Sequence, residues 1–174
     1  SVVRYDPSAD AWSVVAPMNE VRVAAAICAL NGHVYAVGGY QNGNELSSVE
    51  RYDPSTDSWT LVAPMLSARS YSAACVLDGC IFVSGGYGAL SSVEKYDPST
   101  DSWSAVAPMQ HARNSHAMAV LDGHIYVAGG VDEDGDTLRS VERYDAATNS
   151  WSNVADMIEE RTSFGLFVVN GRLM

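Results

Sequence analysis

Residues 79–109, GCIFVSGGYGALSSVEKYDPSTDSWSAVAPM, contain a pattern that recurs along the whole chain. A turn glycine is followed after six residues by a glycine doublet, and a Tyr-Asp pair is followed after seven residues by a Trp and after six more by a Met. An Arg stands four residues beyond each Met, and the next turn glycine stands ten residues beyond each Arg. These positions are Tyr5, Tyr52, Tyr96, Tyr144, Trp12, Trp59, Trp103, Trp151, Met18, Met65, Met109, Met157, Arg22, Arg69, Arg113, Arg161, Gly32, Gly79, Gly123 and Gly171. A period of 44 to 48 residues predicts a repeat architecture rather than a set of independent sites.

One interval of the repeat varies in length while the others stay constant. From Gly38, Gly85 and Gly129, which open the three doublets, the next repeated Tyr is 14, 11 and 15 residues away. The variable loops therefore fall at 40–47, 87–91 and 131–140. Because rigid scaffolds commonly carry recognition in loops, these loops are the first place to look for function.

Composition restricts the partners and the compartment. The chain has 174 residues, is 47% hydrophobic and carries a formal net charge of −11, which predicts a globular domain that repels nucleic acid. It has no charged-then-apolar leader and no apolar run of membrane-spanning length, so we expect no membrane partner. Cys28 and Cys75 share one repeat position, where a small buried side chain is expected, and the third cysteine, Cys80, leaves an odd number. With no Asn-x-Ser/Thr site either, we expect a reducing compartment, the cytosol or the nucleus.

Each unit is expected to form four short strands and no helix. The first strand ends in Asn31-Gly32 or its counterparts Asp78-Gly79, Asp122-Gly123 and Asn170-Gly171, which is the signature of a type I′ hairpin. First strands are rich in Ala and outer strands carry Tyr and Trp, so each unit is a wedge that is narrow inside. Wedges arranged radially make a propeller, and we predict an all-β propeller of four-stranded antiparallel blades. The units run over about 21–64, 68–108 and 112–155.

The two ends of the chain correspond to complementary parts of one further blade, split between 1–16 and 161–174. Either these halves pair within the chain and close a small four-blade ring, or they are the open edges of a fragment. Open strand edges invite pairing with another chain.

At this point the pattern resembles a known family. Gly-Gly, Tyr-Asp-Pro and Trp at this period are similar to the kelch repeat, and the phrases at 48–54 and 62–65, Ser-Val-Glu-Arg-Tyr-Asp-Pro and Val-Ala-Pro-Met, resemble the kelch domains of BTB-kelch proteins. The resemblance implies a non-enzymatic module without a cofactor that binds a protein or peptide, as the substrate receptor of a cullin-RING ubiquitin ligase adaptor. The ligase-docking domains would lie outside this chain. The alternatives are an actin or cytoskeletal scaffold and a kelch-propeller enzyme of the copper-oxidase or sugar-epimerase type.

The chain departs from the family pattern in three respects. Family propellers usually have six blades, whereas three complete units are present here, which leaves the number of blades open. Asp156 and Ala146 replace prolines of the repeat, and Val131 follows a doublet where Tyr40 and Tyr87 follow the others. The last unit is therefore expected to be less regular.

Candidate binding residues gather where the variable loops and the fourth-to-first connections share one face. Four Arg side chains around a channel mouth would hold carboxylates or phosphates, and the alternative is that each bonds carbonyl groups of a neighbouring blade and closes the ring. The resemblance implies that such Arg side chains pair with acidic residues of a partner, and the two roles are compatible. The expected partner segment is acidic or phosphorylated. The expected partner-binding residues are Arg22, Tyr40, Ser47, Arg69, Ser70, Tyr87, Ser91, Arg113, Asn114, His116, Arg161, Thr162 and Phe164.

The sharpest charge cluster is Asp132-Glu133-Asp134-Gly135-Asp136. It lacks the order of an EF-hand loop, because position 143 is an Arg where a bidentate Glu would be needed. We therefore expect no metal and interpret the segment as a solvated loop or as a contact for a basic partner. No catalytic motif occurs, and no catalytic residue is predicted.

Overall fold

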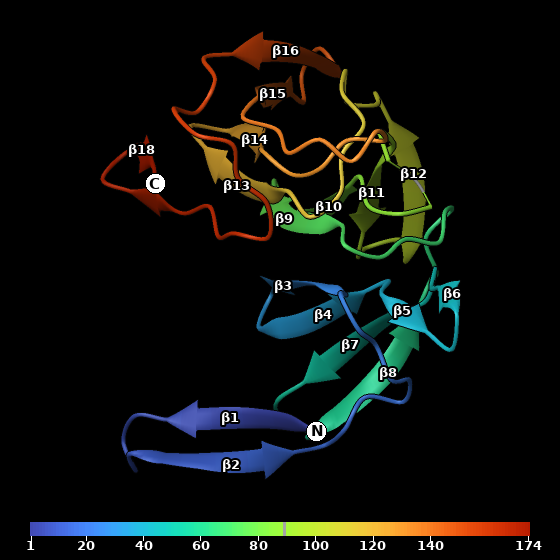
Figure 1. The fold of residues 1–174 in the computed structure, drawn as a ribbon. Helices are drawn as coiled ribbons and strands as arrows, with labels where there is room; N and C mark the ends of the chain where they lie inside the picture. Colours follow the sequence, from blue (N-terminus) through green and yellow to red (C-terminus); the bar gives the residue numbers. More distant parts are fainter. Residues whose placement is uncertain (89) are drawn as a thin grey trace.

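The computed structural model describes residues 1–88 and 90–174, and these residues form antiparallel sheets without any helix. Three four-stranded blades follow one another around an arc (Figure 1). Blade 1 consists of β3 (Ala26–Leu30), β4 (His33–Val37), β7 (Val49–Asp53) and β8 (Ser58–Val62). Blade 2 consists of β9 (Ala73–Leu77), β10 (Cys80–Ser84), β11 (Val93–Asp97) and β12 (Ser102–Val106). Blade 3 consists of β13 (Ala117–Leu121), β14 (His124–Ala128), β15 (Val141–Asp145) and β16 (Ser150–Val154), so the predicted all-β propeller is confirmed.

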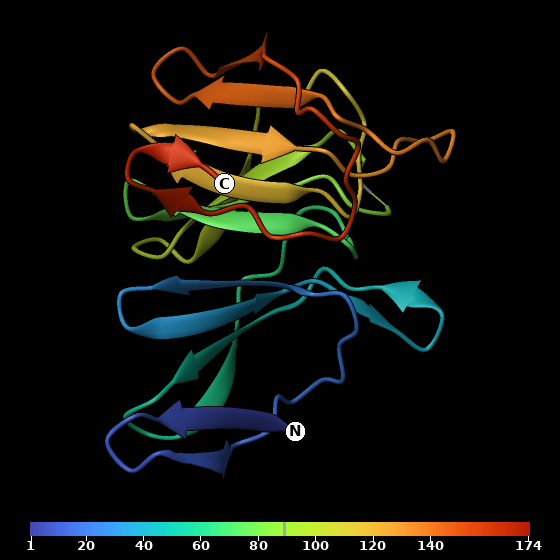
Figure 2. The ribbon, with the colours of Figure 1, turned by 60° about the vertical axis from the view of Figure 1, so that its left-hand side comes forward.

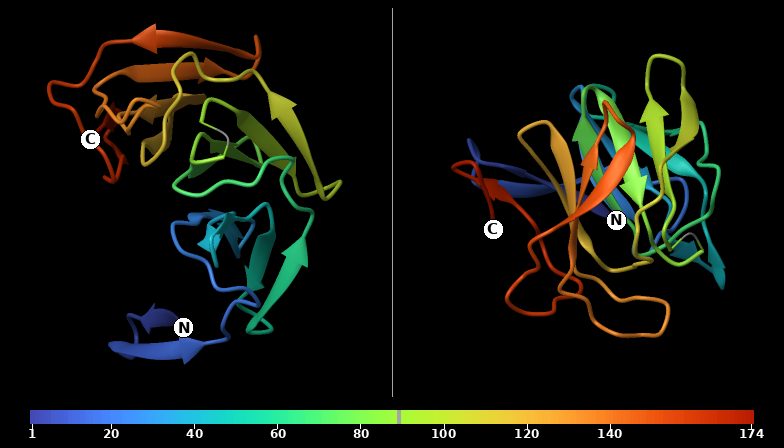
Figure 3. Two further views of the ribbon diagram at one scale, coloured as in Figure 1. Left: turned by 45° about the vertical axis from the view of Figure 1, so that its right-hand side comes forward. Right: turned by 90° about the horizontal axis from the view of Figure 1, so that it is seen from above.

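Two further hairpins lie at the ends of the arc (Figure 3, left). They are β1 (Val2–Asp6) with β2 (Ala11–Val15), and β17 (Val168–Val169) with β18 (Arg172–Leu173). Each is a separate two-stranded sheet, so the described strands do not close into the four-blade ring that the sequence left open. Trp12 in the first hairpin is accordingly 69% exposed.

The turns between first and second strands have the expected type I′ geometry. Asn31 and Gly32 have φ of 51° and 78°, and Asp78 and Gly79 have φ of 50° and 73°. Positive φ at both central positions matches the right-handed twist of the flanking strands. One hairpin was missed: the first variable loop forms β5 (Tyr40–Gln41) and β6 (Asn44–Glu45) around an Asn42-Gly43 turn with φ of 50° and 90°.

The glycine doublets lie where the next blade approaches. Gly85 has φ of 58°, and a Cβ there would collide with the carbonyl oxygen of Arg113 in the following unit. Gly86 has φ of 91°, and a Cβ there would collide with the carbonyl oxygen of Ser70 in its own unit. The sequence therefore needs glycine at both positions, for conformation and for space.

Trp59, Trp103 and Trp151 each bond to the segment before their own blade. Trp103 is 8% exposed, packs on Tyr96 with ring centroids 5.1 Å apart, and donates its Nε1–H to the Ala63 carbonyl at 2.9 Å. Beside it the Asp101 carboxylate accepts the Tyr96 hydroxyl at 2.8 Å and the Ala63 N–H at 2.9 Å. Trp59 is 9% exposed and bonds to Ala16 in the same way, so both tryptophans are largely buried.

The propeller has two unlike faces (Figure 2). The variable loops project together on one side, and the short hairpin turns lie on the other. We call the first side the loop face; it carries 40–47, 87–91 and 131–140 with the fourth-to-first connections, and residue 89 within it lies outside the described residues. Within 1–88 and 90–174 no helix is long and apolar enough to cross a membrane.

Candidate functional site

The repeated Arg of blade 2 is held inside its own unit. The Arg69 Nη1 group donates to the carbonyl oxygens of Gly85 at 3.0 Å and Ser92 at 3.2 Å. Its Nη2 group donates to the Ser92 hydroxyl at 2.9 Å and to a Glu94 carboxylate oxygen at 2.5 Å. The Arg69 side chain is completely buried, and this burial lowers its pKa while the Glu94 carboxylate opposes the shift. Both Nη groups are therefore fully used within the blade, whereas the buried Nε–H has no hydrogen-bond partner among the described residues.

The same clamp recurs in the two other blades. Arg22 bonds to Glu50 at 3.1 Å and Arg113 bonds to Glu142 at 2.8 Å, and all four side chains are fully buried. Each Arg also donates to the carbonyl of the first glycine of its doublet, Gly38 at 2.9 Å and Gly129 at 2.7 Å.

The carboxylate of each clamp also fixes the connection that enters the blade. Glu50 accepts the backbone N–H groups of Asn19 at 2.7 Å and Glu20 at 3.0 Å, and Glu94 does the same for Leu66 and Ser67. Burial raises the pKa of the Glu50 carboxyl, but these N–H groups, with the Asn19 and Arg22 side chains, lower the pKa more, so it lies below its usual value. The clamp thus fixes the base of the loop face.

This arrangement corrects the sequence prediction at three of the four Arg positions. Arg22, Arg69 and Arg113 have no exposed side-chain surface, so they cannot touch a partner in this structure. The alternative also needs correction, because the carbonyls they bond belong to their own blade. Arg161 differs: its side chain is 54% exposed and pairs with Glu159 at 3.2 Å.

The clamp glutamates were missed although the sequence contains their signal. Glu50, Glu94 and Glu142 each stand two residues before a repeated Tyr. A charged residue at a fixed position of a buried strand pattern, repeated with the Arg, indicates a buried ion pair rather than two separate surface charges.

Three further predicted residues are buried within the framework. Ser70 is 1% exposed and forms an isolated bridge with Tyr87, and Asn114 is 2% exposed and donates its Nδ2–H to the Val131 carbonyl at 3.2 Å. His116 is 6% exposed, and its Nε2 lies 2.8 Å from the Ser84 hydroxyl. Burial, and to a smaller extent the positive charges of Arg113 and Arg69, together lower the pKa of His116 to about 3. These residues support the loop face but do not form its surface.

The remaining predicted residues reach the surface. Tyr40 and Tyr87 are 39% and 48% exposed, and Thr162 is also exposed. Ser47, Ser91 and Phe164 are half-buried. Sequence reasoning missed Tyr71, which is 45% exposed and packs edge-on against Tyr87 with centroids 5.7 Å apart. The sequence signal for Tyr71 was an aromatic residue at a repeat position that Ala or Ser occupies in every other unit.

The acidic loop is a compact turn with outward-facing charge. The Asp132 carboxylate accepts the backbone N–H groups of Asp134 at 3.0 Å and Asp136 at 2.9 Å. Glu133 lines a groove of about 600 Å³ between blades 2 and 3, with Ser67, Gly88, Leu90, Ser91, Ser92 and Ala112. In the described part of the chain no three His, Cys, Asp or Glu side chains are grouped as metal ligands would be.

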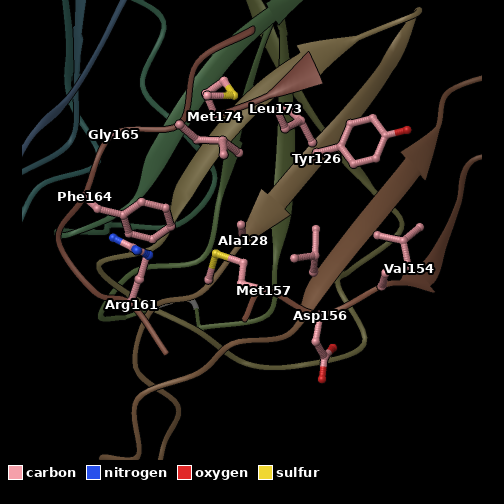
Figure 4. A pocket seen from close by; sticks show the side chains of 13 residues that line it. Tyr126, Ala128, Val154, Asp156, Met157, Arg161, Phe164, Gly165, Leu173 and Met174 are labelled. Atoms are coloured by element: carbon pink, nitrogen blue, oxygen red, sulfur yellow. The ribbon is translucent and has the colours of Figure 1, made fainter. Parts of the chain in front are cut away.

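A second hollow, of about 530 Å³, lies beside blade 3 (Figure 4). Its lining includes Tyr126, Val141 and Met157, which match Tyr35, Val49 and Met65 by repeat position. In blade 1 those three residues are covered by Tyr96 and Trp103 of blade 2 within one core cluster. The apolar lining of this hollow therefore corresponds, by repeat position, to the surface of blade 1 that blade 2 covers.

Comparisons with known proteins agree with this geometry. A family model described as Kelch motif matches residues 22–66, 68–110 and 112–158. Kelch-like protein 4 of Homo sapiens is 49% identical over 49 residues, which are 28% of this chain and 7% of that protein. Kelch-like protein 9 of Mus musculus is 46% identical over 50 residues, which are 29% of this chain and 8% of that protein. The matches thus span less than a tenth of these relatives.

A solved structure, that of YjhT, has the same fold. It superposes with a TM-score of 0.83 over 94% of this chain and 61% of that chain. At 17% identity this likeness concerns the fold alone. The Kelch motifs and the similarity to several Kelch-like proteins together support a module for protein interaction.

Proposed function

The chain belongs to the kelch repeat family, and we propose that it captures a protein or peptide ligand on its loop face, as the substrate receptor of a cullin-RING ubiquitin ligase adaptor. The proposal assigns it no catalytic role. The ligase part of the proposal rests on the resemblance to BTB-kelch proteins and requires docking domains outside this chain. A place in the cytosol or nucleus fits its three free cysteines, of which Cys28 has a pKa raised by burial to about 12.

The observation that carries the proposal is the contrast between the two faces. All variation in the length of the repeat falls in the loop face, whereas the opposite turns are uniform Asn-Gly or Asp-Gly pairs. The loop face also exposes tyrosines on rigid backbone: Tyr40 exchanges hydrogen bonds with Val23 at 2.8 and 3.1 Å, and Tyr87 exchanges them with Ser70 at 2.9 and 3.3 Å. Exposed tyrosines that are already ordered bind at low entropic cost.

The partner surface comprises Tyr40, Ser47, Tyr71, Tyr87 and Ser91, together with Arg161, Thr162 and Phe164 beside the last connection. The expectation of an acidic or phosphorylated partner depended on four exposed Arg side chains. Since three of them are buried against carboxylates, we no longer include that partner class in the proposal.

The test is a selection of peptides on the 174-residue chain from a random dodecamer library. Selected peptides should lose binding to a variant with Tyr40→Val and Tyr87→Val, because Val131 occupies the same position in blade 3 and the fold should tolerate it. A control with Asp78→Asn and Asp122→Asn alters the opposite face, where Asn31 and Asn170 already occupy the position. Peptides that bind both variants as well as the native chain would contradict the proposal.

A further inference from the structure

We propose that the ligand of the loop face presents a cationic side chain, arginine or lysine, to the tyrosine pair of blade 2. This inference rests on the proposed function and specifies the chemistry of the partner. Its elements are the pair Tyr71–Tyr87, the carboxylates on either side of it, and the groove between blades 2 and 3. We call these elements together the tyrosine site.

The tyrosine pair is rigid and open to solvent. The rings of Tyr71 and Tyr87 meet at 88° with centroids 5.7 Å apart, and the two residues are 45% and 48% exposed. The Tyr71 backbone donates to the Ala24 carbonyl at 2.9 Å and accepts from the Ser115 N–H at 2.8 Å, which ties it to both neighbouring blades. An edge-to-face pair leaves negative ring surface free, and that surface attracts cations.

Tyr71 occupies a backbone position that the fold does not require a tyrosine to fill. Its φ is 55°, in the left-handed region, where a bulky residue is a conformational outlier. The same repeat position holds Ala24, Ser115 and Ser163, each with φ of 53° or 54°. Because residues with strained backbone conformations cluster at ligand sites, an exposed tyrosine at this position indicates a role in binding.

Acidic side chains from both adjoining blades lie near Gly88, the residue that follows Tyr87. Glu45, at the end of β6 in blade 1, approaches the second variable loop: its Cγ lies 3.7 Å from where a Cβ would stand at Gly88. From blade 3, Glu133 lines the groove that Gly88 and Ser91 also line. Figure 2 shows these loops projecting on the same side.

The described arginines of the loop face are already engaged by carboxylates. Arg69 and Arg113 are buried in their clamps, Arg139, although 60% exposed at its side chain, pairs with Asp156 at 3.4 Å, and Arg161 pairs with Glu159 at 3.2 Å. The net charge of −11 adds a field that draws cations and repels anions. The charge of the exposed surface thus complements an arginine or lysine of the ligand, the reverse of the acidic segment that the sequence predicted.

The test uses three seven-residue peptides on the 174-residue chain. They are acetylated and amidated Gly-Arg-Gly-Arg-Gly-Arg-Gly and the same peptide with citrulline or Glu in place of Arg. Citrulline keeps the shape of arginine without its charge, so it isolates the contribution of the cation. The readout is the aromatic NMR signals of Tyr71 and Tyr87 during titration, with dissociation constants from the shifts.

Two variants and one control make the result specific. Tyr71→Ser introduces the residue that two other units have at this position, Ser115 and Ser163. Glu45→Gln with Glu133→Gln removes two charges from the site. Each should weaken the Arg peptide about threefold or more, as expected for an exposed cation–π contact or a pair of surface charges. The control, Asp78→Asn with Asp122→Asn, removes the same charge from the opposite face and should leave the dissociation constant unchanged.

The proposal holds if the Arg peptide shifts both tyrosine signals, the citrulline peptide binds more weakly, and only the site variants reduce affinity. Equal loss in the control would show general attraction to an acidic protein and overturn it, as would a preference for the Glu peptide or an absence of tyrosine shifts. If peptides from the dodecamer selection bind the loop face but contain no cation, the inference fails while the proposed function stands. If none depends on the loop face, the proposed function itself fails.

Discussion

His116 should make the stability of this protein depend on pH between neutrality and pH 5. It lies between blades 2 and 3, is 6% exposed, and places its Nε2 2.8 Å from the Ser84 hydroxyl. Burial first, and then the positive charges of Arg113 and Arg69, lower its pKa from 6.5 to about 3. The folded protein therefore keeps this imidazole neutral throughout the range in which an unfolded chain protonates it.

The sign and size follow from proton linkage. Below pH 6.5 the unfolded state binds a proton that the folded state does not bind until about pH 3, so the free energy of unfolding falls as the pH falls through this window. A pH of 5 lies about 1.5 units below the pKa of the histidine in the unfolded chain. At ~1.4 kcal/mol per unit, the free energy of unfolding is lower there by about 2 kcal/mol. The folded histidine is still neutral at pH 5, so this figure depends little on how far below 5 its folded pKa lies.

The assay is urea unfolding followed by tryptophan fluorescence at pH 7 and pH 5. The His116→Gln variant keeps an amide nitrogen near Ser84 but cannot titrate. The change in unfolding free energy between pH 7 and pH 5 is therefore compared between the native chain and the variant, which cancels the contributions of all other titrating groups. We expect that difference to be about 2 kcal/mol. The Ser84→Ala control removes the hydrogen bond but keeps the buried ring, and it should keep the pH dependence of the native chain. Equal losses in the native chain and His116→Gln would refute the assignment of a buried, neutral histidine.

Three further predictions, made with four substitutions, test the framework by thermal or urea unfolding. Trp103→Ala should lower the free energy of unfolding by about 3–5 kcal/mol, because it removes a core aromatic and an inter-blade hydrogen bond; an unchanged melting temperature would mean that the ring is not part of the core. Glu94→Ala should cost about 3–5 kcal/mol because it leaves the Arg69 guanidinium buried without its counter-ion, and a loss below about 1 kcal/mol would argue against the clamp. Gly85→Ala should cost about 3 kcal/mol from positive φ and a backbone collision, whereas Gly79→Ala, whose Cβ would meet nothing within 4 Å, should cost only about 1 kcal/mol; equal costs would contradict the close approach of the next blade.

The repeated features could be predicted from sequence because each depends on residues close together in the chain. An Asp78-Gly79 pair between apolar runs specifies its hairpin locally, and the constant interval from Tyr96 to Trp103 places both residues on paired strands. The glycine doublets recur at a fixed place in the repeat, and they combine positive φ with the close approach of neighbouring backbone. The rule that Asn-Gly or Asp-Gly marks a hairpin also applies to Asn42-Gly43, in the first variable loop.

The binding surface was harder to predict because it depends on residues that meet only in space. Arg69 and Glu94 are 25 residues apart, and the corresponding separations in the other blades are 28 and 29. The recurrence of the Glu was the only signal, because this varying separation does not show that one residue neutralises the other inside a blade. The place of the Arg in the repeat is the same whether its guanidinium faces a channel or is buried in a clamp, so the repeat does not distinguish the two. Likewise Tyr71 and Tyr87 come from different connections, and only the fold makes them a pair.

The most direct test of recognition on the loop face is an NMR map of the native chain with one peptide from the dodecamer selection. The account predicts shifts in the backbone amide signals of Tyr40, Tyr71 and Tyr87, with no shift at the opposite turns that contain Asp78 and Asp122. Shifts centred on those turns, with unchanged signals at the three tyrosines, would contradict it.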